Sequence, residues 1–411
     1  MLERKDSINN ARQQSLVDLQ TGATLIPFGK YRDVEYSDKC GYVLTYTSDS
    51  TWQVFDFSGK LCLEGTKEKT ASIRITPYGV LNLQNYHVGF IPFEGKTIKP
   101  IYKKISFFDN KLGITTQVDT INWEQKQGII TAGGEMLVKP CYNEIYMENN
   151  HIKVIVYGKT AHDHAKEGIL NLNGKVIIAP DKYNTIEYFS EDNVAVVSKS
   201  KYNDDKPSDF GLIDSKGKIL VPVKYRRVYH KNGIAQLETH WPADSNRIIM
   251  GMYNIKTRKM IEPKYDDMKE FVNGISIIGY FNSTGNRYGL LDENGNEIVS
   301  PIYETMFYND TQQYATVSLN KKQGMINAQG KVIVPIIFDR FTEYRPQNNK
   351  NGIVIGQNQN GYAVYNFYTE KEMLPLGKYD KVMCTNEGFL YTIHDRRIYC
   401  TPDGKEIVQQ P

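Results

Sequence analysis

An internal repeat constrains the fold of this chain more than any other feature of its sequence. The sixteen residues from Phe210 to Tyr225 follow the same pattern as the sixteen from Tyr288 to Tyr303. Further copies recur along the chain at a mean spacing of about 38 residues. The second position of these segments, here called the anchor, is usually glycine. The anchors are Leu16, Gln53, Gly89, Gly128, Gly168, Gly211, Gly251, Gly289, Gly324, Gly361 and Ile398.

Three other features stay in phase with the anchor. A second glycine follows six residues later in most copies, as Gly217 follows Gly211. A proline and then an aromatic residue come after a short apolar segment, as in Pro222 and Tyr225. The in-phase aromatic residues are Tyr31, Tyr102, Tyr142, Tyr183, Tyr225, Tyr265, Tyr303, Phe338 and Tyr379.

Each part of the repeat has a structural interpretation. The apolar segments on either side of Gly217 are short and rich in β-branched residues, which predicts strands of four to six residues. Gly217 can adopt the positive φ of a hairpin turn, and Asp214 before it can bind the turn backbone. Pro222 is expected to end its strand, since proline offers no N–H to a ladder. The unit is therefore a meander of three to four antiparallel strands that must stack on its neighbours to bury a core.

The composition agrees with a folded β protein and excludes several classes. Hydrophobic residues make up 40% of the 411 residues and charged residues 24%, which is not the composition of a disordered chain. The formal net charge of +3 argues against a polybasic nucleic-acid binder, and no apolar run is long enough to predict a membrane span. The five cysteines are scattered and predict reduced thiols rather than a disulfide framework. The 29 tyrosines are explained in large part by the repeat itself.

The motif Gly-Leu-Ile-Asp-x-x-Gly-Lys-x-x-x-Pro-x-x-Tyr resembles the WG-repeat family of bacterial proteins, also called KWG repeats. The resemblance extends from about Leu16 to the end of the chain. It implies a bacterial β-repeat protein of the kind suspected of binding or surface roles. The chain departs from the family pattern because the Trp before the anchor glycine is lost from every strong copy. Its place is taken by Gln127, Glu167, Phe210, Met250, Tyr288, Gln323 and Asn360, and only Trp52 retains it.

The expected fold is all-β, with tandem repeats of about 38 residues in an open or superhelical propeller-like array. A closed propeller has four to eight blades, and the ten units plus a terminal half-unit counted here exceed that number. Two stacked partial rings are the alternative arrangement. Residues 1–15 are expected to be a polar N-terminal tail or a short cap helix, and residues 16–411 the array, with the half-unit starting at Ile398.

The best candidate for a metal site is one inter-repeat loop. His162, His164 and Glu167 lie close in sequence there, and such side chains can converge on one ion. A solvated loop is the alternative. No cofactor is predicted, because the Gly95-Lys96-Thr97 segment has its upstream glycine one residue too far for a phosphate-binding loop.

A second insertion contains His240 and Trp241. An exposed Trp in a loop can anchor a partner protein, although it can equally cover the edge of the array. The basic run around Arg226 is replaced by Asp266 and Asp267 in the next unit, so no continuous basic stripe predicts nucleic-acid binding.

These observations favour a non-enzymatic scaffold that binds a protein or another ligand through its inter-repeat loops. No set of acid, base and nucleophile recurs, whereas repeat arrays offer long surfaces to partners. The loops expected to make contact are those that differ between units, at 157–166, 199–209, 239–248 and 281–287. The alternatives are an enzyme or ligand-binding protein with a site in a central channel, and a structural protein of the cell surface or secretion. Without a signal-like apolar stretch, a cytoplasmic location is expected unless another export route operates.

Overall fold

The computed structural model describes residues 2–5, 12–18, 21–47, 50–68, 71–108, 110–121, 123–148, 150–159, 163–199, 209–342, 351–385 and 387–407. These residues form strands and turns, and none of them is in a helix. No described helix could therefore cross a membrane. The chain divides into two compact units, Met1–Tyr188 and Phe189–Pro411.

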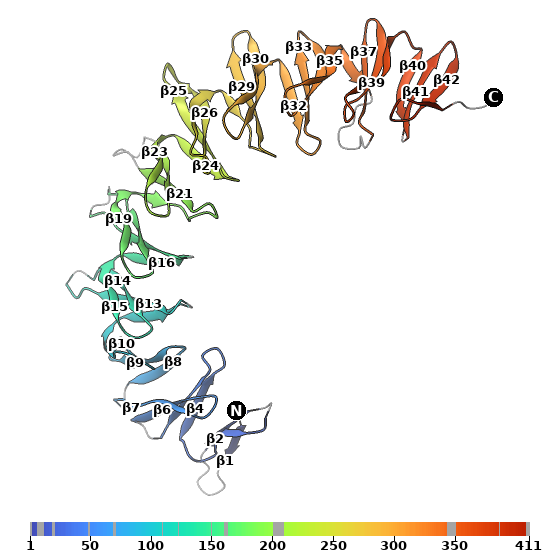
Figure 1. Ribbon diagram of the computed structural model, residues 1–411. Helices are drawn as coiled ribbons and strands as arrows, with labels where there is room; N and C mark the ends of the chain where they lie inside the picture. The colour runs from blue at the N-terminus through green and yellow to red at the C-terminus, as the bar shows by residue number, and fades with distance from the viewer. Residues whose placement is uncertain are drawn as a thin grey trace. The chain divides into compact units, whose positions relative to one another are not determined.

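Unit 1 is a succession of small antiparallel sheets (Figure 1). A three-stranded sheet, β1-β2-β3, is followed by four four-stranded sheets and then by β20. The strands are β1 Leu2–Lys5, β2 Arg12–Val17, β3 Thr24–Ile26, β4 Asp33–Ser37, β5 Tyr42–Tyr46, β6 Thr51–Asp56, β7 Leu61–Thr66, β8 Ser72–Thr76, β9 Gly79–Gln84, β10 His87–Pro92, β11 Ile98–Tyr102, β12 Lys104–Phe107, β13 Leu112–Val118, β14 Gln125–Thr131, β15 Met136–Tyr142, β16 Glu144–Glu148, β17 His151–Val156, β18 Lys166–Asn171, β19 Val176–Tyr183 and β20 Thr185–Ile186.

Unit 2 continues the same pattern. It opens with β21, β22 and β23, paired in this order, and five four-stranded sheets follow. The strands are β21 Val194–Lys199, β22 Asp209–Asp214, β23 Ile219–Tyr225, β24 Arg227–Lys231, β25 Ile234–Trp241, β26 Asp244–Asn254, β27 Met260–Tyr265, β28 Asp267–Met268, β29 Ile275–Asn282, β30 Gly285–Asp292, β31 Glu297–Tyr303, β32 Thr305–Asn309, β33 Tyr314–Leu319, β34 Lys322–Asn327, β35 Val332–Phe338, β36 Arg340–Thr342, β37 Ile353–Asn358, β38 Gly361–Asn366, β39 Lys371–Gly377, β40 Lys381–Thr385, β41 Gly388–Ile393, β42 Arg396–Cys400 and β43 Glu406–Ile407.

The predicted all-β fold of tandem antiparallel meanders is confirmed, and each four-stranded sheet has the strand order of a propeller blade. The sequence repeat and the sheet are out of phase. The anchor lies in the third strand of a sheet, so one sequence unit supplies the last two strands of that sheet and the first two of the next. The last half-unit, from Ile398, accordingly completes sheet β40–β43 rather than standing alone.

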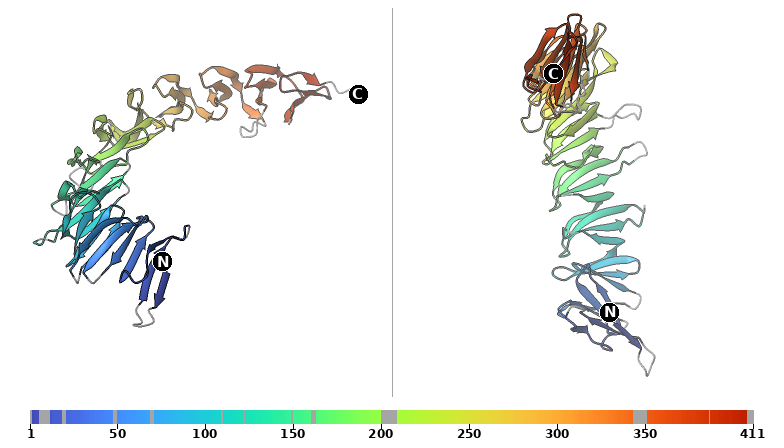
Figure 2. Two further views of the ribbon diagram at one scale, coloured as in Figure 1. Left: turned by 60° about the horizontal axis from the view of Figure 1, so that its bottom comes forward. Right: turned by 90° about the vertical axis from the view of Figure 1, so that its right-hand side faces the viewer.

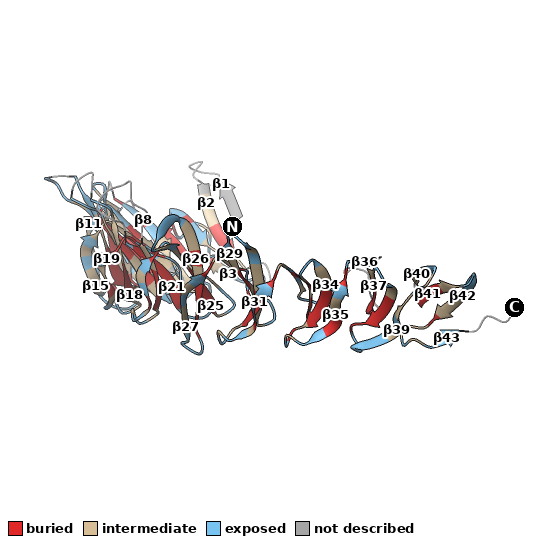
Figure 3. Ribbon diagram, turned by 90° about the horizontal axis from the view of Figure 1, so that it is seen from above, coloured by how far each residue is buried: buried red, intermediate tan, exposed pale blue. Residues whose placement is uncertain are grey.

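The core of each unit lies between successive sheets. Leu44 and Val54 of sheet β4–β7 pack with Ile73 and Val80 of sheet β8–β11. In unit 2, Leu290 of sheet β28–β31 packs with Val317 of sheet β32–β35 in the same way. Figure 2 shows the sheets following one another in chain order within each unit, and Figure 3 shows buried residues on the strands and exposed residues at the turns. Each sheet thus needs its neighbours, as the repeat predicts.

The predicted turn is also confirmed in detail. Gly217 has a φ of 78°, and the Asp214 carboxylate accepts hydrogen bonds from the backbone N–H groups of Lys216 and Lys218 at 3.0 and 2.9 Å. Asn171 accepts two equivalent bonds in its own turn. The small polar residue and the glycine therefore define one turn together.

The prediction that proline ends its strand is wrong. Pro222 lies inside β23, which continues to Tyr225, and the pairing of β22 with β23 shifts register around this position. β23 lies at the edge of its sheet, where a missing N–H and a bulge are tolerated.

Two assignments near the ends of the repeat also differ from the structure. Residues 2–5 and 12–17 form a strand pair, β1 and β2, where a tail or cap helix is expected for residues 1–15. Backbone pairing does not need apolar side chains, so a polar composition conceals such strands. In sheet β36–β39, the pairing of Tyr362 with Gly377 and of Val364 with Leu374 places Ala363, not Gly361, at the anchor position.

Candidate functional site

The loops that differ between units lie at one end of their sheets. The strands alternate in direction, so the hairpin between the second and third strands lies at the same end as the connection to the next sheet. We call this end the loop edge. The hairpins at this edge include residues 85–86, 119–124, 157–165, 242–243 and 283–284, and three of the four predicted contact loops are among them. In the fourth, 199–209, residues 200–208 lie outside the described residues.

The hairpin between β25 and β26 carries the predicted partner-binding residues. Trp241 ends β25 and pairs with Asp244, while His240 pairs with Ile248 and is exposed. The Trp241 ring is partly buried, because the guanidinium carbon of Arg247 lies 5.1 Å from the ring centroid. A cation over an aromatic face restrains both side chains. Trp241 is therefore held in place and still partly accessible, and its binding role stays a prediction.

Arg247 fastens this hairpin to the following sheet. It forms a bidentate ion pair with Asp266, in which Nη2 donates to Oδ2 over 2.6 Å. The Asp266 side chain is only 4% exposed and also accepts a hydrogen bond from the Phe281 N–H at 2.8 Å. The hydrogen bond to Asp266 is the main cause that raises the pKa of Arg247. The hairpin is thus anchored through a pair that joins two planar groups in a fixed geometry.

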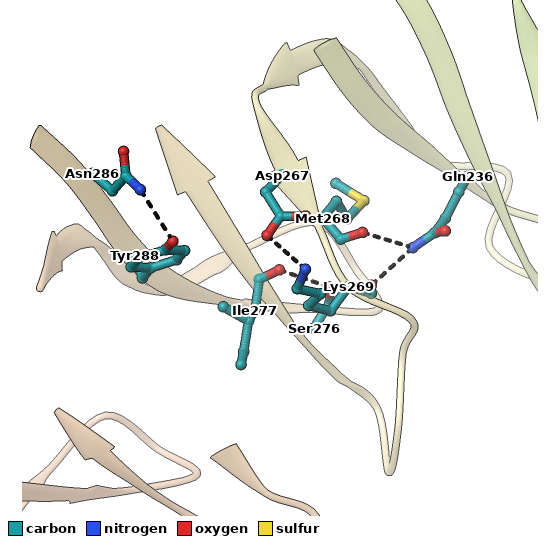
Figure 4. Close-up of polar contacts among 8 residues, drawn as sticks. All are labelled: Gln236, Asp267, Met268, Lys269, Ser276, Ile277, Asn286 and Tyr288. Atoms are coloured by element: carbon teal, nitrogen blue, oxygen red, sulfur yellow. Dashed lines mark hydrogen bonds and ion pairs between the residues drawn. The ribbon is translucent and has the colours of Figure 1, made fainter. Parts of the chain in front are cut away.

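The joint between these two sheets contains further polar contacts (Figure 4). The Gln236 amide on β25 donates to the carbonyl oxygens of Lys269, at 2.8 Å, and Met268, at 3.4 Å. The Ser276 hydroxyl donates to the same Lys269 carbonyl at 2.6 Å. Backbone groups at and just past the end of β28 are therefore satisfied by side chains from both sheets, toward the end opposite the loop edge.

The predicted metal ligands are not shown together in the structure. His162 lies outside the described residues, and the part of the chain that is described contains no group of three His, Cys, Asp or Glu side chains suited to a metal ion. Glu167 accepts a hydrogen bond from the Ile186 N–H at 2.7 Å, and its carboxylate lies 3.6 Å from the Lys153 ammonium. The carboxylate therefore has a structural role, and the metal site remains a prediction for the loop.

Sequence reasoning missed the most exposed apolar side chains of the loop edge. Ile121 and Trp123, in the hairpin between β13 and β14, are 91% and 76% exposed. Tyr86, in the hairpin of the preceding sheet, is fully exposed. The sequence does contain a sign of this exposure, because Trp123 is one of only three tryptophans and lies within an otherwise mostly polar turn. A large apolar residue in a turn is more informative than one in a strand.

One cleft of about 300 Å³ lies in unit 1. Burial and the neighbouring Asp33 raise the pKa of Glu35. Burial, with smaller effects of Glu35 and Asp33, raises the pKa of Tyr46 to about 12. Both shifts oppose negative charge on the two groups themselves. The lining of the cleft, which has neither histidine nor cysteine, consists of Gln14, Arg32, Asp33, Val34, Glu35, Tyr46, Lys67, Ala71 and Ser72.

Comparison with known proteins supports the repeat assignment. A family model described as "WG containing repeat" matches five segments, at residues 168–202, 210–236, 250–279, 288–322 and 324–350. This chain therefore contains WG repeats across residues 168–350. The four-stranded sheets outside residues 168–350 have the same antiparallel meander.

Similar solved structures are β-rich proteins of low identity. BamB from Moraxella catarrhalis is 10% identical, with 71% of this chain and 92% of that chain covered and a TM-score of 0.22. PorZ, a surface component of the type-IX secretion system of Porphyromonas gingivalis, is 11% identical, with 96% and 60% covered and a TM-score of 0.19. The β-propeller domain of the Trilobed protease from Pyrococcus furiosus is 9% identical, with 74% and 92% covered and a TM-score of 0.23. No curated protein sequence matches the chain.

Proposed function

We propose that this WG-repeat chain is a non-enzymatic scaffold that binds a protein partner through the loop edge. Its variable hairpins recur at one end of successive sheets, so each unit can present several of them on a continuous surface. The sheets supply a rigid support, and loops on such a support are the usual place of recognition.

The observation that carries the proposal is the support of Trp241. Its ring is fixed by Arg247, which is fixed in turn by the buried Asp266. A partly exposed aromatic side chain held in one orientation loses little entropy on binding, which is the property of an interface anchor. A merely solvated loop does not need a buried carboxylate to orient it.

The proposal is tested by site-specific photo-crosslinking in the native host. A photoreactive amino acid is placed at His240, on the loop edge, and at Lys256, in the turn at the opposite end of the same sheet. Both residues are exposed, so the two positions form a matched pair. We expect a discrete crosslinked protein from position 240 that is weakened at least tenfold by Trp241→Ala and retained in Trp241→Phe.

Equal crosslinking from positions 240 and 256 contradicts the proposal, since a specific interface lies at one end of the sheet. So does crosslinking at 240 that is unaffected by Trp241→Ala. The melting temperature of each variant shows whether the chain remains folded.

A further inference from the structure

We propose that the hairpin at residues 119–124, together with Tyr86 on the neighbouring hairpin, inserts into the headgroup region of an anionic lipid surface. This inference goes beyond the protein partner proposed above and concerns a different pair of sheets. It starts from three side chains at the loop edge of unit 1 that are largely or fully exposed, Tyr86, Ile121 and Trp123.

The two hairpins belong to adjacent, packed sheets. Phe90 of sheet β8–β11 packs with Ile105 and Ile130 of sheet β12–β15. The connection between the sheets runs along the loop edge. Tyr102 pairs with Val88, two residues from Tyr86, and the Lys103 N–H donates to the Thr116 carbonyl at 2.8 Å, three residues before Asp119. The three apolar side chains therefore lie at the same end of two neighbouring sheets.

Hydrogen bonds within the hairpin restrain its backbone on both sides of the tip. The Asp119 carboxylate accepts the Ile121 N–H at 2.7 Å, and the Trp123 N–H donates to the Asp119 carbonyl at 2.9 Å. Trp123 has a φ of 61°, a conformation that side chains other than glycine and asparagine rarely adopt. The backbone thus turns two large apolar side chains outward, where both are largely exposed.

The chemistry of this tip favours a lipid surface over a protein pocket. The side chains protrude from narrow hairpins, and a lipid surface accepts protruding groups without a complementary cavity. Trp and Tyr prefer the interfacial region, where the ring is buried and its polar atom stays hydrated. Exposed Lys103 and Lys104 lie between the hairpins, and anionic headgroups attract them. The hairpin itself contains two carboxylates. Glu124 lies 3.4 Å from the Lys126 ammonium, which partly neutralises its charge, and Asp119 accepts the Ile121 N–H.

The test uses the full chain and vesicles of phosphatidylcholine and phosphatidylglycerol at a 3:1 ratio. Trp52 is 1% exposed and Trp241 can be replaced by Phe, so Trp123 becomes the reporter for solvent. We expect co-sedimentation with these vesicles and a blue shift of Trp123 emission. Ile121→Ser with Trp123→Asn should reduce vesicle affinity at least tenfold, and asparagine tolerates the φ of position 123. Lys103→Gln with Lys104→Gln should reduce it about fivefold for each lysine.

Three results would overturn the inference. The first is an absence of binding to these vesicles at low salt. The second is equal sedimentation of the Ile121→Ser, Trp123→Asn variant, with its melting temperature unchanged. The third is a photo-crosslink from position 123 to a protein in place of vesicle binding, which identifies a protein interface at this hairpin. None of them affects the Trp241 proposal, whose test lies in unit 2.

Discussion

At the scale of single residues, the structure explains why the anchor is glycine. A Cβ at Gly128 would lie 2.5 Å from the Val138 carbonyl oxygen and 2.7 Å from the Pro140 nitrogen. The same approach recurs at Gly251, where Ile261 and Pro263 supply the neighbouring atoms. The bulged fourth strand lies against the third at this point in both sheets, so no side chain fits between them there.

This close approach predicts that Gly128→Ala destabilises the protein by about 1–3 kcal/mol, because backbone atoms must move to admit a methyl group. Gly133 in the same sheet is the matched control. A Cβ there would meet its nearest atom, the Glu94 carbonyl oxygen, at 3.5 Å, and its φ is not left-handed. Chemical denaturation should show Gly133→Ala within about 1 kcal/mol of the parent. Equal effects of the two substitutions would contradict the steric explanation.

The residues that replace the family's tryptophan also have a role at this scale. The Gln127 side chain accepts a hydrogen bond from the Ile145 N–H at 2.7 Å, and Gln323 accepts one from Phe341 at 3.2 Å. Both bonds join the third strand of one sheet to the first strand of the next. Glu167 makes the same contact in its own sheet, and so does Gln14, which lies two residues before the anchor Leu16. At these four positions a polar side chain thus satisfies a backbone donor at the joint between sheets.

At the scale of elements, tyrosines of the repeat connect successive fourth strands. The Tyr225 hydroxyl on β23 donates to Glu262 on β27 at 2.9 Å, and the Tyr265 hydroxyl on β27 donates to Glu297 on β31 at 2.7 Å. Both rings are fully buried, as the repeat predicts for core aromatics. The ring of each tyrosine is part of the core, and its hydroxyl bonds a carboxylate on the fourth strand of the next sheet. Each tyrosine therefore stabilises both the core and the contact between successive sheets.

The Tyr265–Glu297 contact predicts a loss of stability in acid. Partial burial raises the pKa of Glu297. Hydrogen bonds from Tyr265 and Lys264 lower it, and together with the Lys264 charge they outweigh burial, so the pKa lies below its ordinary value. A carboxylate with a lowered pKa stabilises the folded state above its ordinary pKa of about 4.3, and this stabilisation is lost as the pH falls through the lowered value. Glu297→Gln should therefore flatten the fall of the melting temperature below about pH 5. The exposed Glu135→Gln serves as control, and an identical acid profile for both variants would refute the linkage.

At the scale of the whole molecule, each of the two units is a series of sheets that contact their neighbours. Tyr265 shows this arrangement, because its cluster combines Ile234 and Met252 of sheet β24–β27 with Ile278 and Leu291 of sheet β28–β31. In such arrays, stability is approximately a sum of sheet and nearest-neighbour terms. A local defect should therefore spread only to adjacent sheets.

Tyr265→Ala should accordingly destabilise by about 3–5 kcal/mol, as truncation of a buried aromatic residue does. Tyr225→Ala should do the same one sheet earlier. Hydrogen exchange should rise in sheets β24–β27 and β28–β31 and remain at parent values in sheet β40–β43. Uniform acceleration across unit 2 would show a single cooperative core instead, and an unchanged melting temperature in both variants would refute the assigned register.

Much of the architecture could be predicted from the repeat, because the features that carry it are local. The turn at Gly217 depends on residues within a few positions, and the strands depend on short apolar segments. The strand of residues 2–5, the proline within β23 and the anchor at Ala363 could not be predicted. Each depends on pairing with another strand, which local patterns do not encode. The candidate site was predicted at Trp241 and missed at Trp123, since exposure is a property of the folded chain.

By itself, the sequence determined the period, the β class and the turn chemistry, because these arise from residue spacing and backbone preferences. Only the tertiary structure decided where one sheet ends and the next begins, why Gly128 and Gly251 tolerate no side chain, and which loops share an edge. Those properties come from contacts between strands that the repeat places in different sequence units. The physical reason is that a single unit buries no core, so its sheets are completed and positioned by their neighbours.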